Sequence, residues 1–411
     1  MVKGPNAREE MMDRRQIIAD FVEAHGDVYK QIALDIHGRP EVSNYEFFAC
    51  ERLSKQLEAE GFTVKTDVAG HRTGFSAVYS GGKKGPVLAF LAEYDALAGL
   101  GHGCGHNLFG ATSLLAASAL KQIVDDAGGE VRVYGTPGEE GGENGSAKGS
   151  FVRDGFFKDV DAALCVHPGT GPHRLTGNSL ACAPVDIEFW GKAAHAAGVP
   201  EQGINALDAL IQVYNSINAL RQHLKTDVRI HGIITNGGDA PNTVPDYAKA
   251  KFYLRAATVP TLEDVYRKVT NIVEGAALAT GAKGRMQPYQ NRVENTIPTP
   301  SFDAVYQKNM ESLGEKFVEL EEERKPGSSD VGNVSQVVPV IQPGISIKAE
   351  RVPGHSEQMK AAACSEQGLA SILLGAKALA YTALDLIEDP KLLDAIKDEH
   401  RKLLAEQAAS A

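Results

Sequence analysis

The sequence lacks the features that mark several specialised classes of protein. It has no uninterrupted run of about 20 apolar residues, which a membrane-spanning helix needs. Its five cysteines in 411 residues are an odd number and widely scattered, which argues against a disulfide framework and is typical of a reducing compartment. The N-terminal stretch MVKGPNAREEMMDRR has charges but no apolar core after them, so no secretory signal is predicted. We therefore expect a cytoplasmic protein.

Positive charge is also in short supply. Lys and Arg number 42 against 53 Asp and Glu, which gives a net charge of −11. Phosphate backbones and anionic lipids repel such a chain, so neither a nucleic acid nor a membrane is expected as a partner. Hydrophobic residues make up 43% of the chain and charged residues 23%, which is ordinary for globular proteins. At roughly 150 residues per domain, the length predicts two or three domains.

The first part of the chain alternates between helix and strand patterns. Apolar residues at helical spacing over 17–22 predict a helix that breaks at Gly26, and a second helix is expected to open at Ser43, with Glu46 completing a capping box, and to end at Gly61. Strands and helices then alternate over 75–80, 87–92, 108–124, 130–134, the stretch after 145, and 162–166. Because these strands are apolar on both faces, the pattern favours a parallel or mixed sheet covered on both sides.

The pattern changes near Cys182. Residues 185–190 (VDIEFW) alternate between polar and apolar, so one face of that strand is expected to be wet. The expected elements then follow the order β-α-β-β-α-β of a ferredoxin-like domain: 185–190, 205–223, 229–235, 247–256, 261–278 and 285–290.

After a Pro-rich hinge at 296–300 the α/β character returns, with an apolar run at 337–347 and a long helix from about Ser365. We interpret the acidic run 319–323 as a solvated helix face and 391–411 as a charged, Ala-rich tail. We therefore predict an α/β domain in two parts, residues 1–183 and 294–411, interrupted by an α+β insertion at 184–293.

The segment GLGHGCGHN (99–107) is the most informative one. It places Cys104 and His106 two residues apart among glycines, directly after a predicted strand. Thiolate and imidazole groups are preferred ligands of zinc-like ions. Taken alone, the segment is equally compatible with a glycine-rich turn in which Cys104 is a small buried hydrophobe and His106 caps a helix.

Three other segments carry candidate groups. In YGTPGEEGGENG (134–145), the adjacent Glu139 and Glu140 suggest a division of labour, in which one carboxylate binds a cation and the other takes a proton from water. His167 (CVHPG) ends an apolar strand at the edge of a sheet where ligands bind, and His355 (VPGHSEQ) lies in a late turn. Taken singly, these segments read as a solvated acidic loop and structural histidines. Together with the Cys-Gly-His segment they supply five ligands and one base for a two-metal hydrolytic site.

The motifs GHGCGHN, TPGEE, VHP and PGHS, in this order, resemble those of the M20 metallopeptidase/amidohydrolase family, in its Cys-Gly-His branch. The segment GKAAHAAGVPEQGINALDAL (191–210) is similar to the dimerisation-domain motif of that family, and the resemblance runs from about residue 36 to the C-terminal helix. It implies a zinc-peptidase-like catalytic domain with a mixed sheet and an inserted lid and dimerisation domain. It also implies a homodimer and two divalent ions per chain, zinc or manganese, with cobalt as a further option.

The resemblance also implies roles for individual residues. Five would be ligands of the two ions, with the thiolate as the bridge: Cys104, His106, Glu140, His167 and His355. Glu139 would be the general base and acid, and Asp95 (AEYDAL) would orient a ligand. In many members the lid histidine that matches His195 reaches the partner subunit's active site and stabilises the oxyanion. Asn242 and Arg255 match lid positions that hold the carboxylate of the substrate.

Two departures from the family pattern bear on the substrate. Asn107 follows the Cys-Gly-His motif where most members have Asp, and the late motifs PGHS and GSSDVGN (327–333) differ from the commoner forms. These features look closer to the aminobenzoyl-glutamate hydrolase B-subunit type and its animal dipeptidase relatives. The expected reaction is hydrolysis of the amide bond of a small N-acyl or aryl-acyl amino acid. A metallo-dipeptidase or carboxypeptidase, and a subunit that is active only beside a partner, remain as alternatives.

Two other functions account for less of the sequence. A nucleophilic Cys104 with His106 as its base would leave Glu140, His167 and His355 without a role. A binding protein that kept the fold and lost the chemistry is disfavoured by the intact set of ligands.

Overall fold

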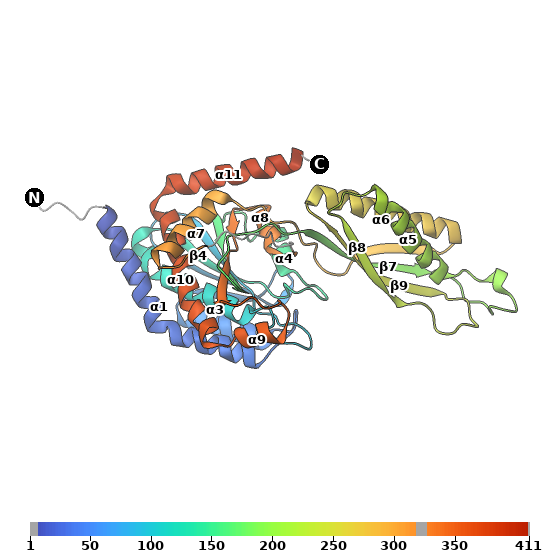
Figure 1. Ribbon diagram of the computed structural model, residues 1–411, viewed down its shortest axis with the longest axis horizontal. Coiled ribbons are helices and arrows are strands. Elements are labelled where there is room, and N and C mark those ends of the chain that lie inside the picture. The colour runs from blue at the N-terminus through green and yellow to red at the C-terminus, as the bar shows by residue number, and fades with distance from the viewer. Residues whose placement is uncertain (1–6, 318–326, 410–411) are drawn as a thin grey trace, which may run out of the picture. The chain divides into compact units, whose positions relative to one another are not determined.

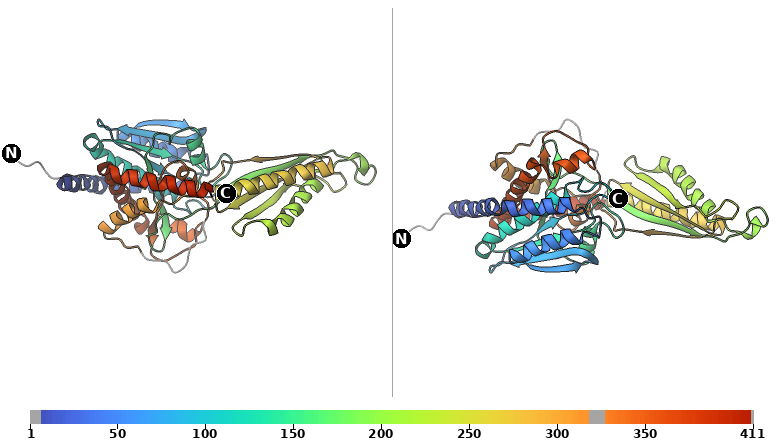
Figure 2. Two further views of the ribbon diagram at one scale, coloured as in Figure 1. Left: turned by 90° about the horizontal axis from the view of Figure 1, so that it is seen from above. Right: turned by 90° about the horizontal axis from the view of Figure 1, so that it is seen from below.

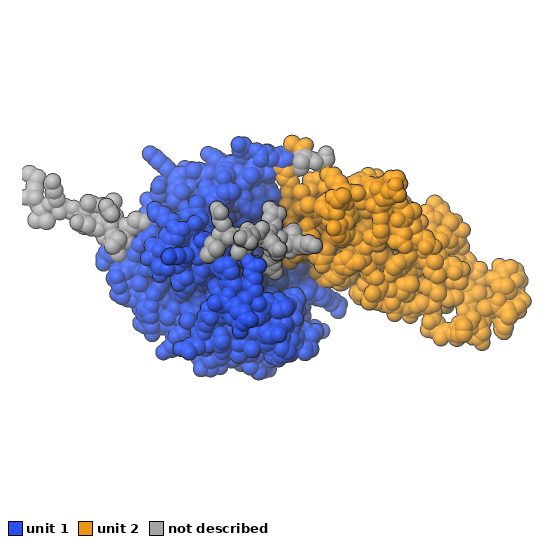
Figure 3. All heavy atoms as spheres, in the orientation of Figure 1, with its two compact units in different colours: residues 1–178, 296–326, 330–406 blue, residues 179–295, 327–329, 407–411 orange. Residues whose placement is uncertain are grey.

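The computed structural model describes residues 7–317 and 327–409, so the acidic run 319–323 lies outside the described residues. The chain forms two compact units (Figures 1 and 3). The first comprises Met1–Asn178, Thr296–Pro326 and Asp330–Glu406, and the second Ser179–Asn295, Gly327–Ser329 and Gln407–Ala411.

A six-stranded mixed sheet forms the centre of the first unit, in the order β1-β2-β4-β3-β5-β11. Its strands are β1 (Thr63–Val68), β2 (His71–Ser80), β3 (Val87–Ala92), β4 (Glu130–Gly135), β5 (Ala162–Leu164) and β11 (Val340–Ile341). Strands β4, β3, β5 and β11 are parallel, whereas β2 is antiparallel to both β1 and β4. A separate parallel pair consists of β6 (His167–Thr170) and β12 (Gly344–Lys348). The predicted mixed sheet is confirmed.

Helices cover both faces of this sheet (Figures 1 and 2). On β3, Leu88 and Phe90 belong to one hydrophobic core and Ala89 and Leu91 to another, as expected for a strand whose successive side chains point to opposite faces. The first core includes residues of α1 (Ala7–Gly38), α2 (Phe47–Ala59), α3 (His106–Ala127), α7 (Pro300–Ser312), α9 (Glu357–Ala362), α10 (Glu366–Glu388) and α11 (Pro390–Ala409). The second core includes residues of α4 (Ala147–Arg153) and α8 (Val331–Ser335).

The predicted break in the first helix is wrong, because α1 continues through Gly26 to Gly38. A Cβ atom at Gly26 would lie 2.8 Å from Leu373 Cδ2 of α10. The glycine therefore permits close packing of the two helices and does not end α1.

The predicted capping box of the second helix is also wrong. Helix α2 starts at Phe47, and its first amides are bonded by Glu41, whose carboxylate accepts from the N–H groups of Phe48 and Ala49 at 3.1 Å each. The Glu46 side chain is buried and accepts from Thr73 Oγ1 at 2.8 Å and from the N–H of Gly138 at 3.0 Å. It thus holds the loop that carries Glu139.

Two C-terminal helices complete the first unit. Helix α10 begins after Ser365, whose hydroxyl accepts from the N–H of Gly368. By length and composition, α10 is apolar enough to span a membrane, even though its apolar residues form no uninterrupted run in the sequence. However, 78% of its most apolar window is buried in the protein. It is therefore a core helix here. The segment interpreted as a charged tail forms α11, where Ile396 is buried and His400 Nε2 lies 2.6 Å from the carbonyl oxygen of Ser335.

The second unit has a four-stranded antiparallel sheet in the order β10-β7-β9-β8. Its elements are β7 (Ala181–Trp190), the short 3-10 turn Pro200–Gln202, α5 (Ala206–Leu220), the 3-10 turn Arg221–His223, β8 (Arg229–Asn236), β9 (Tyr247–Ala256), α6 (Val259–Thr280) and β10 (Lys283–Pro288). Helices α5 and α6 share one core with the sheet. The order β7-α5-β8-β9-α6-β10 is the predicted ferredoxin-like arrangement.

The alternating sequence of β7 predicted that one face of this strand is wet, and this prediction is wrong. Asp186 is only 5% exposed and Glu188 only 7%. Lys249 Nζ lies 2.6 Å from one carboxylate oxygen of Asp186 and Lys251 Nζ 3.0 Å from the other, and Arg285 pairs with Glu188 at 2.7 Å. Long basic side chains thus cover this central strand, which hydrophobic periodicity does not reveal.

Candidate metal centre and active site

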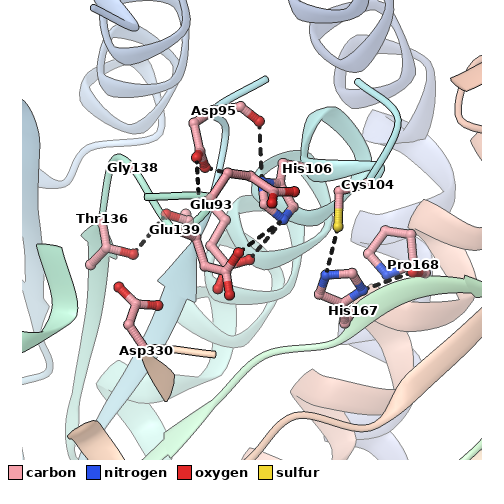
Figure 4. A network of polar contacts seen from close by, with 12 residues as sticks. Glu93, Asp95, Cys104, His106, Thr136, Gly138, Glu139, His167, Pro168 and Asp330 are labelled. Carbon is pink, nitrogen blue, oxygen red and sulfur yellow. Dashed lines mark hydrogen bonds and ion pairs between the residues drawn. The ribbon is translucent and has the colours of Figure 1, made fainter. Parts of the chain in front are cut away.

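The predicted site residues of the first unit come together beyond the ends of neighbouring strands. Figure 4 shows Asp95, Cys104, His106, Glu139 and His167 among them. The parallel strands β3, β4 and β5 are neighbours, so their carboxyl ends meet there. The loop after β3 leads to Cys104 and His106, the loop after β4 carries Glu139 and Glu140, and β6, which follows β5, starts at His167.

Five side chains form two overlapping groups with the composition of metal sites. One consists of Cys104, His106 and His167, the other of Cys104, Glu140 and His355, and the ligand atoms of each group lie within 4.8 Å of one another. Cys104 Sγ is 3.5 Å from His167 Nε2, and Glu140 Oε1 is 3.3 Å from His355 Nε2. The structure therefore brings together all five predicted ligands. Only the thiolate belongs to both groups, and sulfur has lone pairs enough to bridge two ions.

The histidine rings present the correct nitrogens for a cation. His106 Nδ1 is 3.0 Å from Asp95 Oδ1 and His167 Nδ1 is 2.8 Å from the carbonyl oxygen of Pro168. Both partners are acceptors, so each Nδ1 donates its hydrogen, and in the neutral ring Nε2 is the nitrogen that carries the lone pair for a cation. His106 Nε2 and Glu140 Oε1 are buried, and each lies 3.3 Å from an ionisable group, Glu93 Oε2 and His355 Nε2 respectively. Thiolate, imidazole and carboxylate groups gathered in this way are the ligands that zinc and similar ions take in proteins, so the donor set fits divalent ions.

Asp95 holds two of the ligand loops at once. One carboxylate oxygen faces His106 Nδ1, and the other accepts from the N–H of Glu140 at 2.9 Å. Burial alone would raise the pKa of Asp95, but the charge and hydrogen bond of His106 lower it. The geometry is that of a residue that orients ligands from behind, as the resemblance implies for Asp95.

The adjacent carboxyl groups Glu139 and Glu140 differ in proton affinity. Burial, followed by the nearby carboxylates of Glu93 and Glu140, raises the pKa of Glu139 well above its usual range. Burial would also raise the pKa of Glu140, but its hydrogen bond with His355 and the charge of His106 lower it. When two carboxyl groups have pKa values shifted in opposite directions, the one with the raised pKa is suited to proton transfer and the one with the lowered pKa to binding a cation.

Two backbone features bring the late turn and the glycine loop into place. The N–H of His355 donates to the carbonyl oxygen of Gly103 at 3.1 Å, and His355 has a φ of +54°, which is uncommon for a residue other than glycine. Gly105 has a φ of +83°, and a Cβ there would lie 2.9 Å from Pro168 Cβ.

Asn107, the departure from the family motif, is buried and donates to the carbonyl oxygens of Ala33 and Ala363. Asn107 thus connects α3 to α1 and to the C-terminal end of α9. It is not a member of either group of candidate ligands.

The three predicted lid residues belong to the second unit. His195 is exposed, and its Nδ1 accepts from the N–H groups of Ala197 and Gly198 at 3.2 and 3.0 Å. Asn242 is next to Thr243, which forms a β-bridge with His195. Arg255 is on β9, where it donates to Ser328 Oγ at 2.8 Å.

Sequence reasoning missed three charged residues beside the predicted centre. Glu93 Oε2 lies 3.3 Å from His106 Nε2, and Glu93 Oε1 lies 2.7 Å from Lys148 Nζ. Lys148 Nζ is also 2.6 Å from Asp330 Oδ1. All three side chains are fully buried. The one available signal was the pair Glu93 and Asp95 in a Glu-x-Asp pattern at a strand end.

Comparison with known proteins agrees with this geometry. Residues 183–281 match the model of the Peptidase dimerisation domain of M20 enzymes. Over 98% of its length the chain is similar to the Xaa-Arg dipeptidase of Mus musculus, with 34% identity across 95% of that protein. The chain belongs to the M20 peptidase family. It is therefore a metal-dependent hydrolase of amide or peptide bonds, which confirms the predicted class of enzyme.

Other M20 relatives span the chain equally well. The B-subunit of the p-aminobenzoyl-glutamate hydrolase of Escherichia coli (strain K12) is 33% identical, over 96% of this chain and 96% of that protein. The fold is similar to the crystal structure of a dinuclear metal binding M20 peptidase from Bacillus subtilis, with a TM-score of 0.62 and 21% identity over 88% of this chain and 99% of that one. The fold predicted from the M20 motifs is confirmed.

Proposed function

We propose that this M20 enzyme uses two divalent ions to hydrolyse the amide bond of a small N-acyl or aryl-acyl amino acid. The observation that carries the proposal is the membership of Cys104 in both groups of candidate ligands. Cys104, His106 and His167 would hold one ion, and Cys104, Glu140 and His355 the other. A thiolate and imidazoles favour zinc by softness, and the carboxylate is also suited to manganese or cobalt.

When bound, the ions would lower the pKa of water and polarise the carbonyl oxygen of the substrate. Glu139, with its raised pKa, would accept the proton of the attacking water and return it to the leaving amine. Asp95 would keep His106 and Glu140 in place during both proton transfers.

The second unit would supply contacts to the substrate. His195 would donate from Nε2–H to the developing oxyanion, because Nδ1 already accepts from two backbone amides and the hydrogen therefore lies on Nε2. Arg255 and Asn242 would hold the free carboxylate of the substrate. A dipeptide and an aminobenzoyl-glutamate each carry a carboxylate next to the amide nitrogen, so this anchor would serve both types of substrate.

A dipeptidase is the second candidate, favoured by the 34% identity to the Xaa-Arg dipeptidase over nearly the whole chain. A third arrangement, in which the chain acts only beside a different chain, is suggested because the Escherichia coli relative is the B-subunit of its hydrolase. The two enzyme candidates share the metal centre and differ in whether the acyl part carries a free amine.

Metal content and hydrolysis of a small panel would test the proposal: N-acetyl amino acids, aminobenzoyl-glutamate, and dipeptides ending in Arg or Glu. We expect about two ions per chain, loss of hydrolysis on chelation, and recovery with zinc, manganese or cobalt. Preference for the acyl substrates supports the amidohydrolase, and preference for dipeptides supports the dipeptidase. Hydrolysis that persists after complete removal of metal would contradict both. Two bound ions without any hydrolysis would support the metal centre and indicate either a substrate outside the panel or a missing partner chain.

The second unit would also form a homodimer, since it matches a dimerisation domain. Strand β8 is an edge of its sheet, and Ile233 and Ile234 on it are 65% and 44% exposed. A second β8 would pair its free backbone groups and bury these side chains. We expect light scattering to give twice the mass of the chain, 43.9 kDa, and an Ile233→Lys variant to be a monomer. A wild-type monomer would exclude the dimer and any action of His195 in the partner's site.

A further inference from the structure

Lys148 forms a buried ionic link behind the candidate metal centre. It is the second residue of α4, its ammonium contacts Glu93 and Asp330, and its own N–H donates to Asp330 Oδ2 at 3.1 Å. Lysine is almost never fully buried unless it is paired. Burial would lower the pKa of Lys148, but the carboxylates of Asp330 and Glu93 reverse this effect and raise it. The ammonium is therefore held by two carboxylates that favour its charged form, and the backbone N–H by one of them.

The link reaches the centre through Glu93, which directly follows β3. One oxygen of Glu93 is bound by Lys148 Nζ at 2.7 Å, and this contact turns the other oxygen toward His106 Nε2 at 3.3 Å. Glu93, His106 and Glu139 also form a third group whose ligand atoms lie within 4.8 Å of one another. A carboxylate held beside the ligand nitrogen adds a fixed negative charge where a cation would bind.

We propose that Lys148 is a positioning residue of the metal centre, which acts by holding the Glu93 carboxylate beside His106. Without the ammonium, Glu93 would lose the contact that fixes its direction, and the ion bound by His106 would lose an ordered negative neighbour. This inference rests on the proposed metal centre and adds to it two residues that the family motifs do not assign.

A direct charge effect of Lys148 would have the opposite sign. Removing a cation near a site for divalent ions relieves repulsion and tightens metal binding. The positioning role predicts weaker binding, and a role in folding alone predicts unchanged binding by the chains that fold. The sign of the change in metal affinity therefore separates the three roles.

Cobalt(II) titration of the metal-free full-length chain would make the test, because cobalt bound to a thiolate has a visible absorption signature that does not depend on catalysis. We expect Lys148→Met and Glu93→Gln each to weaken cobalt binding about tenfold to a hundredfold, the range typical of residues that support metal ligands. The double variant should bind cobalt as tightly as whichever single variant has the lower affinity, because both changes interrupt the same link.

Arg15→Met is the matched control. Arg15 pairs with Asp385 at 2.7 Å and lies over the ring of Tyr381, away from the centre. The control should lower stability against denaturant and leave cobalt affinity unchanged. If Lys148→Met does not fold, Lys148→Gln makes the same comparison, because its amide can still donate to Asp330 but carries no ammonium to hold Glu93.

Unchanged or tighter cobalt binding, or fully additive effects in the double variant, would overturn the positioning role. A wild-type chain that binds no cobalt would overturn the proposed function and this inference together. Cobalt binding by wild type without hydrolysis of any amide would overturn only the proposed substrate, and the comparison of variants would still decide the role of Lys148.

Discussion

Replacing Glu139 by Gln is expected to remove nearly all turnover while both metal ions stay bound. The amide has the size of the carboxyl group but accepts no proton at neutral pH. General acid–base catalysis contributes a factor of about 10² to 10⁴ in rate, so we expect kcat to fall by this factor, which is about 3 to 5 kcal/mol of barrier. Steady-state kinetics with the best substrate, together with metal analysis of the variant, would measure both parts.

Glu143→Gln is the control for this change, because Glu143 is exposed and lies in the same loop. It should retain normal turnover and metal content. A Glu139→Gln enzyme with more than a tenth of the wild-type kcat would show that another group transfers the proton. Loss of metal from that variant would place Glu139 among the ligands instead.

Replacing Cys104 by Ala is expected to have the second large effect, on metal stoichiometry. The thiolate is the one member common to both groups of candidate ligands, so its loss leaves two ligands for each ion. We expect metal content to fall from about two ions per chain to one or fewer, and hydrolysis to fall at least as far as in the Glu139 variant. Elemental analysis of the purified protein would measure the first effect without reference to substrate.

Cys165→Ala tests whether loss of any buried thiol has this result. Cys165 is buried just after β5, and its sulfur contacts the carbonyl oxygen of Ile341. This variant should keep both ions and lose about 1 kcal/mol of stability or less. Two ions and a normal rate in Cys104→Ala would exclude a bridging thiolate.

The sequence predicted those parts of the site that depend on local pattern and order along the chain. Cys104, His106, Glu140 and His167 follow strand ends, and parallel neighbouring strands bring such ends together. The sequence predicted the exact bounds of two strands, 87–92 and 247–256, because their composition and flanking turns agree with their burial. His355 joined the set only through the order of the motifs.

The residues that were missed depend on contacts between distant segments. Lys148 lies in a helix and Asp330 precedes one, and in a sequence such charges look like solvated helix surface. Glu46 looked like half of a capping box, whereas its carboxylate is bonded to Thr73 and Gly138. Gly26 looked like a helix end because the sequence does not show Leu373 packed against it. In each case the partner is far along the chain, and local periodicity carries no information about it.

The two hydrogen bonds of Asp95 have a consequence for how the enzyme acquires its ions. They hold the loops of His106 and Glu140 together through protein contacts alone. In small zinc domains, the free energy of metal binding supplies the free energy of folding, and the chain without metal is unfolded. Here the hydrophobic core and the contacts of Asp95 would let the chain fold before its ions bind. Newly made chains would fold first and be loaded afterwards, so the ions they carry would reflect which metals their surroundings supply at that moment.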